Sequence, residues 1–231
     1  MNSILKLIVV SALAIGATTL AGSSARAQRR QTLVSGASPF PAGCVTSPFN
    51  FEINYENSEV EPWIAVDPKS ADHLIGVWQQ DRWQFGGAHG LMTGVSWDGG
   101  FTWRRTFAHF SRCAGGTAAN GGNYERATDP WVTISPSRVA FQISYSFNFF
   151  DANQAILVSR SFDGGGTWTE PDTLLLDTDP FVSDDKESIT ADPKRGRFVY
   201  AVWDRLVFDN SFNILAGPTW FSRTADGGGS W

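Results

Sequence analysis

An eight-residue motif occurs three times along the chain. It reads SWDGGFTW at 96–103, SFDGGGTW at 161–168 and TADGGGSW at 224–231, with the shared form [ST]-x-D-G-G-x-[ST]-W. Its aspartates, Asp98, Asp163 and Asp226, are 65 and 63 residues apart (163 − 98 and 226 − 163). A near-constant period of this kind is typical of repeat architectures, in which one supersecondary unit is copied along the chain.

The motif has the composition of a tight turn between two strands. Apolar runs precede it, for example at 91–95 and 155–158, so it is expected where a strand ends. The paired glycines permit positive φ, and the Asp carboxylate can accept backbone N–H groups across the turn. The Trp is expected to begin the next strand and bury its ring. Three equivalent turns do not converge on one substrate atom, so we interpret Asp98, Asp163 and Asp226 as structural.

Four antiparallel strands are predicted around each motif, apart from the fourth of the last repeat. The expected strands cover 62–66, 73–79, 91–97 and 103–109, then 129–134, 138–147, 154–160 and 168–176, and finally 187–191, 198–203 and 219–222. An x-Pro pair ends the first strand of each repeat, at Pro68, Pro136 and Pro193. The 23 glycines, 10 tryptophans and 18% charged residues suit an all-β chain of short strands and turns.

The octapeptide resembles the Asp-box, or bacterial neuraminidase repeat, of sialidase-like β-propellers. The resemblance implies an all-β propeller of four-stranded antiparallel blades, here roughly 61–116, 127–178 and 185–231, after a leader at 28–60. Propellers typically have at least four blades, so about three blades predict an incomplete propeller or closure by association of chains. Non-enzymatic propellers carry the same box, so the motif indicates fold and not activity.

The N-terminus has the pattern of a secretory signal peptide at 1–27. Lys6 precedes an apolar stretch at 7–15, and Ala25-Arg26-Ala27 forms an A-x-A cleavage site. A membrane anchor is the competing interpretation, but the apolar stretch is too short for it. We therefore expect a secreted or periplasmic protein without a membrane span after cleavage. The net charge of −5 disfavours nucleic-acid binding, and the oligomeric state stays open.

The chain contains two cysteines, Cys44 in the leader and Cys113 after the first motif. In an oxidising compartment a disulfide between them is expected, and two free thiols are the alternative. The bond would close a loop of 69 residues (113 − 44), for which chain entropy suggests about 4 kcal/mol of stabilisation.

Strand order places the x-Pro turns and the octapeptides at one end of each repeat, which we call the turn end. The loops between second and third strands, and the connections between repeats, lie at the opposite end, which we call the open end. In sialidase-like propellers, the resemblance implies, the active site lies at the open end. The polar and aromatic residues expected there are Asp81, Arg82, Trp83, Tyr124, Arg126, Asp129, Trp203 and Arg205.

The resemblance assigns roles to these residues. Sialidases of this type bind the sialic acid carboxylate with three arginines and use an Asp as acid/base with a Tyr/Glu nucleophile pair. The three arginines would then be Arg82, Arg126 and Arg205, and Asp81 or Asp129 the acid. The sugar would stack on Trp83, Tyr124 and Trp203. The alternative is a set of ordinary salt bridges on exposed loops.

One departure limits the resemblance. The family's first arginine sits in an [FY]-R-I-P motif, which is absent here, and its nucleophilic Tyr comes late in the propeller, beyond Trp231. We therefore predict a secreted exo-α-sialidase-like propeller that acts on or binds glycans or sialoglycoconjugates, without a full catalytic site. The alternative function is a non-catalytic extracellular propeller that binds glycan or protein.

No metal or other cofactor is expected. Asp177, Asp179, Asp184 and Asp185 offer oxygen ligands for a structural calcium ion, but acidic loops are usually just solvated, so this is a weak possibility. The three histidines, His73, His89 and His109, lack the spacing of a zinc site.

Overall fold

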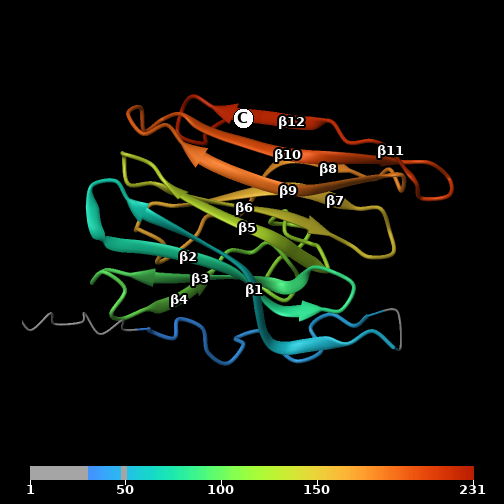
Figure 1. Ribbon diagram of the computed structural model, residues 1–231, viewed down its shortest axis with the longest axis horizontal. Helices are drawn as coiled ribbons and strands as arrows, with labels where there is room; N and C mark the ends of the chain where they lie inside the picture. Colours follow the sequence, from blue (N-terminus) through green and yellow to red (C-terminus); the bar gives the residue numbers. More distant parts are fainter. Residues whose placement is uncertain (1–30, 48–50) are drawn as a thin grey trace, which may run out of the picture. The chain divides into compact units, whose positions relative to one another are not determined.

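A computed structural model of the protein describes residues 31–47 and 51–231 (Figure 1). The expected signal peptide at 1–27 lies outside these residues. The described part is all-β and contains strands but no helix, and so it includes no helix that is long and apolar enough to cross a membrane. Residues 32–231 form one compact unit.

The strands fall into three antiparallel groups, which we call the first, second and third repeat. The first repeat contains β1 (Asn54–Asp67), β2 (Ser70–Trp83), β3 (Ala88–Ser96) and β4 (Arg104–Phe107). The second contains β5 (Arg126–Ile134), β6 (Ala140–Phe147), β7 (Gln154–Ser161) and β8 (Asp172–Asp177). The third contains β9 (Val182–Ala191), β10 (Val199–Phe208), β11 (Ile214–Ala216) and β12 (Thr219–Thr224), in which both β11 and β12 pair with β10.

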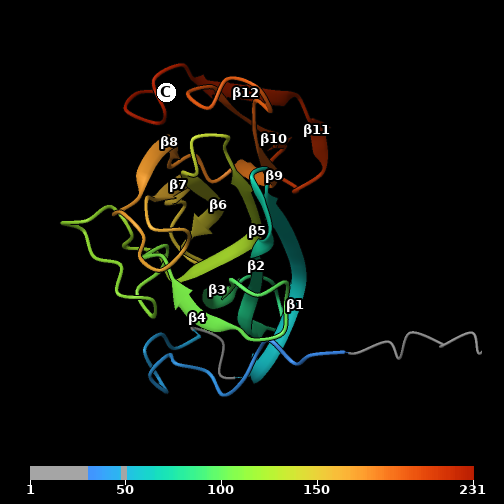
Figure 2. The same ribbon diagram turned by 90° about the vertical axis from the view of Figure 1, so that its left-hand side faces the viewer.

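The three repeats succeed one another in chain order, with the second between the other two (Figures 1 and 2). The first strands of successive repeats are neighbours, because β1 contacts β5 and β5 contacts β9. One bridge between Ala88 and Ala127 also joins β3 to β5. Functional side chains carried by β1, β5 and β9 are therefore brought together.

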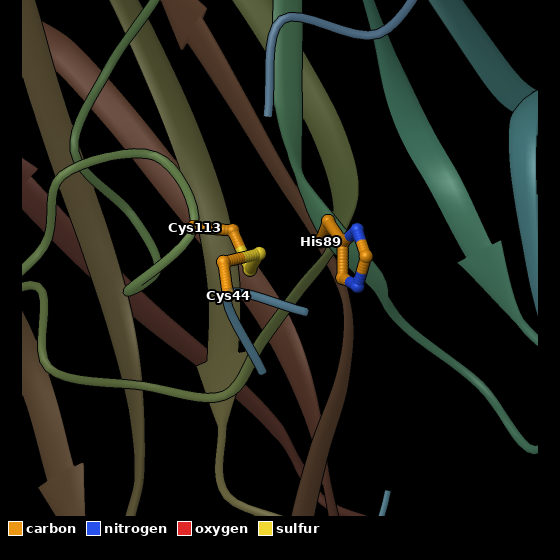
Figure 3. A group of neighbouring side chains, drawn as sticks. All are labelled: Cys44, His89 and Cys113. Carbon is orange, nitrogen blue, oxygen red and sulfur yellow. A yellow bond between two sulfur atoms is a disulfide. The ribbon is translucent and has the colours of Figure 1, made fainter. Parts of the chain in front are cut away.

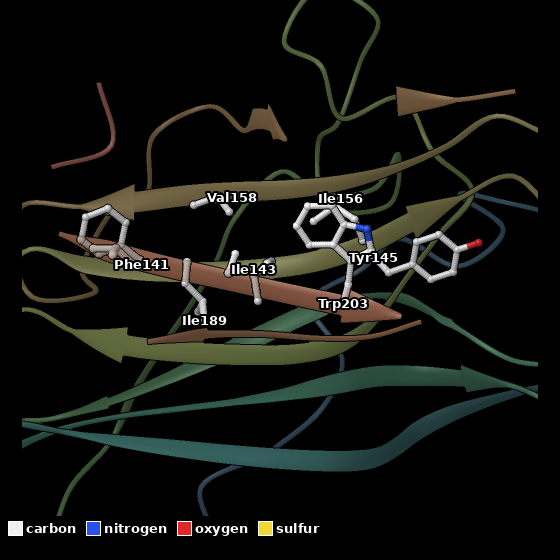
Figure 4. Close-up of a cluster of buried hydrophobic side chains, with 9 residues drawn as sticks. Phe141, Ile143, Tyr145, Ile156, Val158, Ile189 and Trp203 are labelled. Atoms are coloured by element: carbon white, nitrogen blue, oxygen red, sulfur yellow. The ribbon is translucent and has the colours of Figure 1, made fainter. Parts of the chain in front are cut away.

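The second repeat is buried on both faces. Ile156 and Val158 of β7 face the third repeat, where they pack with Ile189 and Trp203 (Figure 4). The alternate residue Leu157 packs in a separate cluster that includes Leu91 of β3. Since successive strand residues point to opposite faces, burial of both sets explains the uninterrupted apolar run at 155–158.

The leader covers one face of the first repeat. Phe40 packs with Trp78 of β2 and Met92 of β3 in a buried cluster. Cys44 and Cys113 also belong to this cluster and form a disulfide, with 5.2 Å between their Cα atoms. The leader is thus held both by apolar contacts and by a covalent bond that spans 69 residues.

The three octapeptides form turns with the same hydrogen bonds. In the second, the Ser161 hydroxyl donates to Asp163 over 2.8 Å and accepts the Gly165 N–H over 2.7 Å. Asp163 also accepts the N–H of Thr167 over 2.9 Å and its hydroxyl over 2.8 Å. Equivalent bonds to Asp98 and Asp226 close the other turns.

The paired glycines of the second octapeptide combine positive φ with close packing. Gly164 and Gly165 have φ of 76° and 94°. A Cβ on Gly164 would lie 2.3 Å from the Trp97 ring, and one on Gly165 would lie 2.8 Å from Val95. His73 of β2 and Thr106 of β4 also donate hydrogen bonds to the carbonyl groups of these two glycines, over 2.9 and 2.7 Å. The second turn is therefore fastened to the first repeat.

Several strand boundaries differ from the expected ones: β9 begins at Val182 rather than Glu187, β10 runs to Phe208 rather than Trp203, and the short strand β11 is unexpected. Two further differences have a clear local cause. β1 begins at Asn54 rather than near Pro62, because register shifts within the β1–β2 pair allow the strand to continue through the proline. β8 begins at Asp172 rather than Trp168. The Trp168 ring donates its N–H to Thr106 across the repeats, and Pro171 cannot donate a ladder hydrogen bond, so the strand starts only after both.

Replacing Asp163 by alanine is expected to lower the free energy of unfolding by about 1–2 kcal/mol, because three turn hydrogen bonds are lost at a partly exposed carboxylate. Urea unfolding followed by tryptophan fluorescence measures the change. Glu56→Ala, at an exposed carboxylate of β1, is the control and should change stability by less than about 0.5 kcal/mol. Equal effects of the two substitutions would contradict the structural role of the turn.

Candidate functional site

One position on the first strand of each repeat has an unusual backbone. Glu61 of β1, Asp129 of β5 and Lys186 of β9 have φ of 53°, 50° and 53°, which is rare for residues other than glycine. The pairing of each strand with its neighbour shifts register at this point. Each of the three residues lies seven positions before the strand-ending proline of its repeat, so the three positions are equivalent. Such bulges re-aim side chains and are common beside functional sites.

A pocket of about 400 Å³ lies at these three residues. Its apolar side is formed by Trp63 and Trp131, which follow Glu61 and Asp129 at the same offset and stack with their ring centroids 3.5 Å apart. Trp63 remains 40% exposed. We call this the inner-strand pocket, and its lining is Glu61, Pro62, Trp63, Asp129, Pro130, Trp131, Lys186, Glu187 and Ser188.

Three carboxyl groups of the pocket region share protons. Burial would raise the pKa of Asp129, but hydrogen bonds from Glu61, Asp185 and Thr128 hold it at about 2. Burial, together with the bond to Asp129, raises the pKa of Asp185 to about 6 and also raises the pKa of Glu61. Asp129 is therefore the ionised acceptor, and Glu61 and Asp185 donate to it when they are protonated, which for Asp185 means below about pH 6.

Lys186 is the cation closest to this group. Its Nζ lies 3.5 Å from Asp129, and its backbone N–H donates to the same carboxylate over 3.1 Å. Although burial acts to lower the pKa of Lys186, the charge of Asp129 raises it. The next residue, Glu187, is buried completely, which raises its pKa well above the usual range, and it accepts the N–H of Tyr145.

An amide and a guanidinium extend the network. Gln79 of β2 donates to Glu61 over 2.6 Å and to Thr128 over 2.9 Å. Arg82 in turn donates to the side-chain oxygen of Gln79 over 2.6 Å. Arg82 and Asp129 are thus the two residues from the sequence-predicted set that belong to the environment of the pocket.

The spacing of these carboxyl groups can be compared with that of the catalytic pair in glycosidases. Glycosidases need two carboxyl groups about 5–9.5 Å apart on opposite sides of the scissile bond. Here Glu61 and Asp185 are direct hydrogen-bond partners of Asp129, which places them closer together than the glycosidase spacing. The three groups are therefore arranged to share protons and to accept hydrogen bonds.

The other two arginines each have their own partners. Arg126 is 1% exposed, donates to both carboxylate oxygens of Glu52 over 2.9 and 2.7 Å, and lies over the Trp83 ring. Arg205 forms ion pairs with Asp177 and Asp184. In the structure these two arginines, which the sequence predicted to bind a ligand carboxylate with Arg82, are thus paired with carboxylates of the chain itself.

The expected stacking residues are core residues. Trp83, Tyr124 and Trp203 are 5%, 8% and 3% exposed, and burial raises the pKa of Tyr124. Asp81 is buried as well. Burial would raise its pKa, but His89, Ser38, the Asn57 N–H and Gln80 hold it at about 2, so Asp81 stays ionised and is poorly suited to donate a proton.

The aspartates considered for calcium point to protein groups. Asp177 and Asp184 face Arg205, Asp179 accepts the N–H of Phe181, and Asp185 joins Asp129. In the part of the chain that the structure describes, one group of three side chains has ligand atoms close enough together for a metal ion, and it is Cys44, His89 and Cys113.

Sequence reasoning missed Glu61, Gln79, Trp63, Trp131 and Lys186 as site residues. The signal was present in the x-Pro pairs. Aligning the repeats on them places Glu-Pro-Trp, Asp-Pro-Trp and Lys-Glu-Ser at one position, which marks that position as special on three neighbouring strands.

Comparison with protein-family models and with curated proteins finds no match. Among solved structures, the Hadza microbial sialidase Hz136 aligns with a TM-score of 0.51 and 15% identity, over 73% of this chain and 36% of that one. A protein of unknown function from Dyadobacter fermentans DSM 18053 aligns with a TM-score of 0.47 and 14% identity, over 77% and 55%. Trypanosoma rangeli sialidase aligns with a TM-score of 0.46 and 15% identity, over 77% and 30%.

The chain thus spans about a third of the length of the Hz136 sialidase. At 15% identity this likeness concerns the fold, which is sialidase-like and all-β.

Replacing Asp185 by asparagine is expected to reduce a pH dependence of stability. The folded-state pKa of about 6 exceeds the unfolded value of about 3.9, so the folded chain binds more protons between these values. Stability is therefore highest below about pH 4 for this group and falls as pH rises to 6. Urea unfolding at intervals from pH 4 to 7 measures the slope.

The amide that Asp185→Asn introduces can still donate to Asp129 but does not titrate, so the slope should become shallower. Asp72→Asn, at an exposed site, is the matched control and should keep the slope of the wild type. An unchanged slope in the Asp185 variant would contradict proton sharing between Asp185 and Asp129.

Proposed function

We propose that the chain is part of a secreted, non-catalytic β-propeller that binds glycans in the inner-strand pocket. The observation that carries this proposal is the pairing of stacked tryptophans with a proton-sharing carboxyl group at equivalent positions of the repeats. An exposed indole face offers apolar area to a sugar ring, and ionised carboxylates accept bonds from its hydroxyl groups.

In this proposal the three repeats are successive blades of an incomplete propeller with Asp-box turns. The sialidase-like fold supports this view. So does the far face of the third repeat, where Val202 and Phe221 stand opposite each other across β10 and β12 and are 37% and 59% exposed. A further blade would bury them.

The preferred ligand is a neutral or amino sugar. The pocket region contains four acidic residues and two basic ones, Lys186 and Arg82. The acidic residues are Glu61, Asp129, Asp185 and Glu187. A sialic acid carboxylate would be brought beside the ionised Asp129, and like charges at close range repel. Arg126, which is buried and held by Glu52, offers it no free guanidinium.

Trp63→Ala and Trp131→Ala are each expected to weaken glycan binding at least tenfold, about 1.4 kcal/mol, because each removes part of the stacking surface. Binding to immobilised neutral, amino and sialylated oligosaccharides gives both affinity and preference. Trp220→Ala is the matched control, since Trp220 is 44% exposed, close to the 40% of Trp63, and lies on β12 away from the pocket lining. Equal losses in all three variants, or a preference for sialylated ligands, would contradict the proposal.

The second candidate is an exo-α-sialidase-like hydrolase, which the sialidase-like fold favours. Incubation of the chain with a fluorogenic sialoside separates the two. Binding alone predicts no release of fluorophore above that of a heat-denatured sample. Release that disappears in Asp129→Asn would establish the hydrolase instead. Arg126→Ala is unsuited to this test because it leaves Glu52 unpaired in a buried site.

A further inference from the structure

The disulfide between the leader and the first repeat lies beside a histidine. Figure 3 shows Cys44 and Cys113 next to the ring of His89. A ring nitrogen of His89 and the two sulfur atoms all lie within 4.8 Å of one another. Two sulfur ligands and one imidazole are a ligand set that suits zinc, with a fourth position left open.

The histidine is oriented in the way that metal-ligating histidines are. Its Nδ1 lies 3.3 Å from Oδ2 of Asp81, which also accepts the Ser38 hydroxyl, while Oδ1 of the same carboxylate accepts the Asn57 N–H. Because the carboxylate only accepts, Nδ1 carries the proton and Nε2 has a free lone pair. Nε2 is buried and has no hydrogen-bond partner among the described residues. A carboxylate behind a histidine is the usual outer shell of a zinc site.

An ion has a route to these atoms. A pocket of about 450 Å³ is lined by His89 and by Gly43 and Val45, the two neighbours of Cys44. Its lining includes the exposed carboxylate of Glu56, which attracts cations toward the pocket that contains His89.

The leader is positioned without the disulfide as well. Phe40, Val34 and Val45 pack against Trp78 and Met92, so apolar contacts continue to hold Cys44 near Cys113 when the sulfurs are separate. The Ser38 hydroxyl also donates to Asp81. Two thiols released here would therefore stay close together and close to His89.

We propose that the reduced chain binds one Zn²⁺ through Cys44, Cys113 and Nε2 of His89, with Asp81 as the positioning residue. A dithiol reductant supplies two electrons and two protons, is itself oxidised to a disulfide, and converts the S–S bond into two thiols. Zn²⁺ then displaces both thiol protons, and a water molecule completes four-coordination. The leader is thus fastened to the first repeat by a disulfide in oxidising surroundings and by a metal ion in reducing ones.

Co²⁺ titration of the reduced chain under anaerobic conditions tests the proposal, because tetrahedral thiolate–cobalt centres absorb in the visible and near-ultraviolet range. We expect saturation at one Co²⁺ per chain, full displacement by one equivalent of Zn²⁺, and no signal from the oxidised chain. His89→Gln and Asp81→Asn should each weaken Zn²⁺ binding by about 10–100-fold. His109→Gln, at a histidine paired with Glu170, is the matched control and should bind like the wild type.

Several results would overturn the proposal. One is the absence of the cobalt signal from the reduced chain. Another is equal affinity in His89→Gln and the wild type, which would mean that the thiols act alone. A ratio of one ion to two chains would indicate intermolecular binding. The proposal requires the leader to stay docked after reduction. Loss of the native near-ultraviolet circular dichroism on reduction would show that it does not.

Discussion

The structure depends on the closure of the octapeptide turns. Each Asp carboxylate accepts the N–H and the hydroxyl of one later residue, and this geometry requires positive φ at two glycines. At Gly164 and Gly165 the same glycines also allow the turn to touch Trp97 and Val95 of the preceding repeat. A local constraint on the backbone therefore sets how closely the first two repeats pack. A side chain at either glycine position would disturb the turn conformation and the contact between the repeats together.

The inner-strand pocket follows from that packing. When successive repeats are held in fixed succession, equivalent positions on β1, β5 and β9 become neighbours. A bulge in each strand then presents Glu61, Asp129 and Lys186 to one another. This one repeat position is thus a carboxylate in the first two repeats and a lysine in the third. In the first two repeats a tryptophan follows it two residues later. The lining of the pocket comes from all three repeats.

Sequence alone predicted the strands and turns because these depend on local periodicity, on Gly pairs and on x-Pro ends. It did not predict which side chains at the open end are exposed and unpaired, and so able to contact a ligand. Arg126 looked available for a ligand, but it is 1% exposed and its partner Glu52 lies 74 residues away in the sequence. Trp203 looked exposed near a loop, but it packs against Ile156 of the second repeat. The repeat period shows where each structural unit begins and ends. Whether a side chain is free to bind a ligand depends instead on which faces of neighbouring repeats pack together.

His73 shows how stability is shared between repeats. Its two ring nitrogens face Asp67 of its own repeat and the Gly164 carbonyl of the next, and its ring stacks on Trp97. Such bonds join neighbours only, so the repeats behave as links of a one-dimensional chain whose cooperativity passes from each unit to the adjacent one. The second repeat has a neighbour on both sides and is the thermodynamic centre. In the described part of the chain the first and third repeats each contact mainly one other repeat, but the first is also held by the leader and its disulfide. Local opening is therefore expected to begin in the third repeat, at the red end in Figure 1.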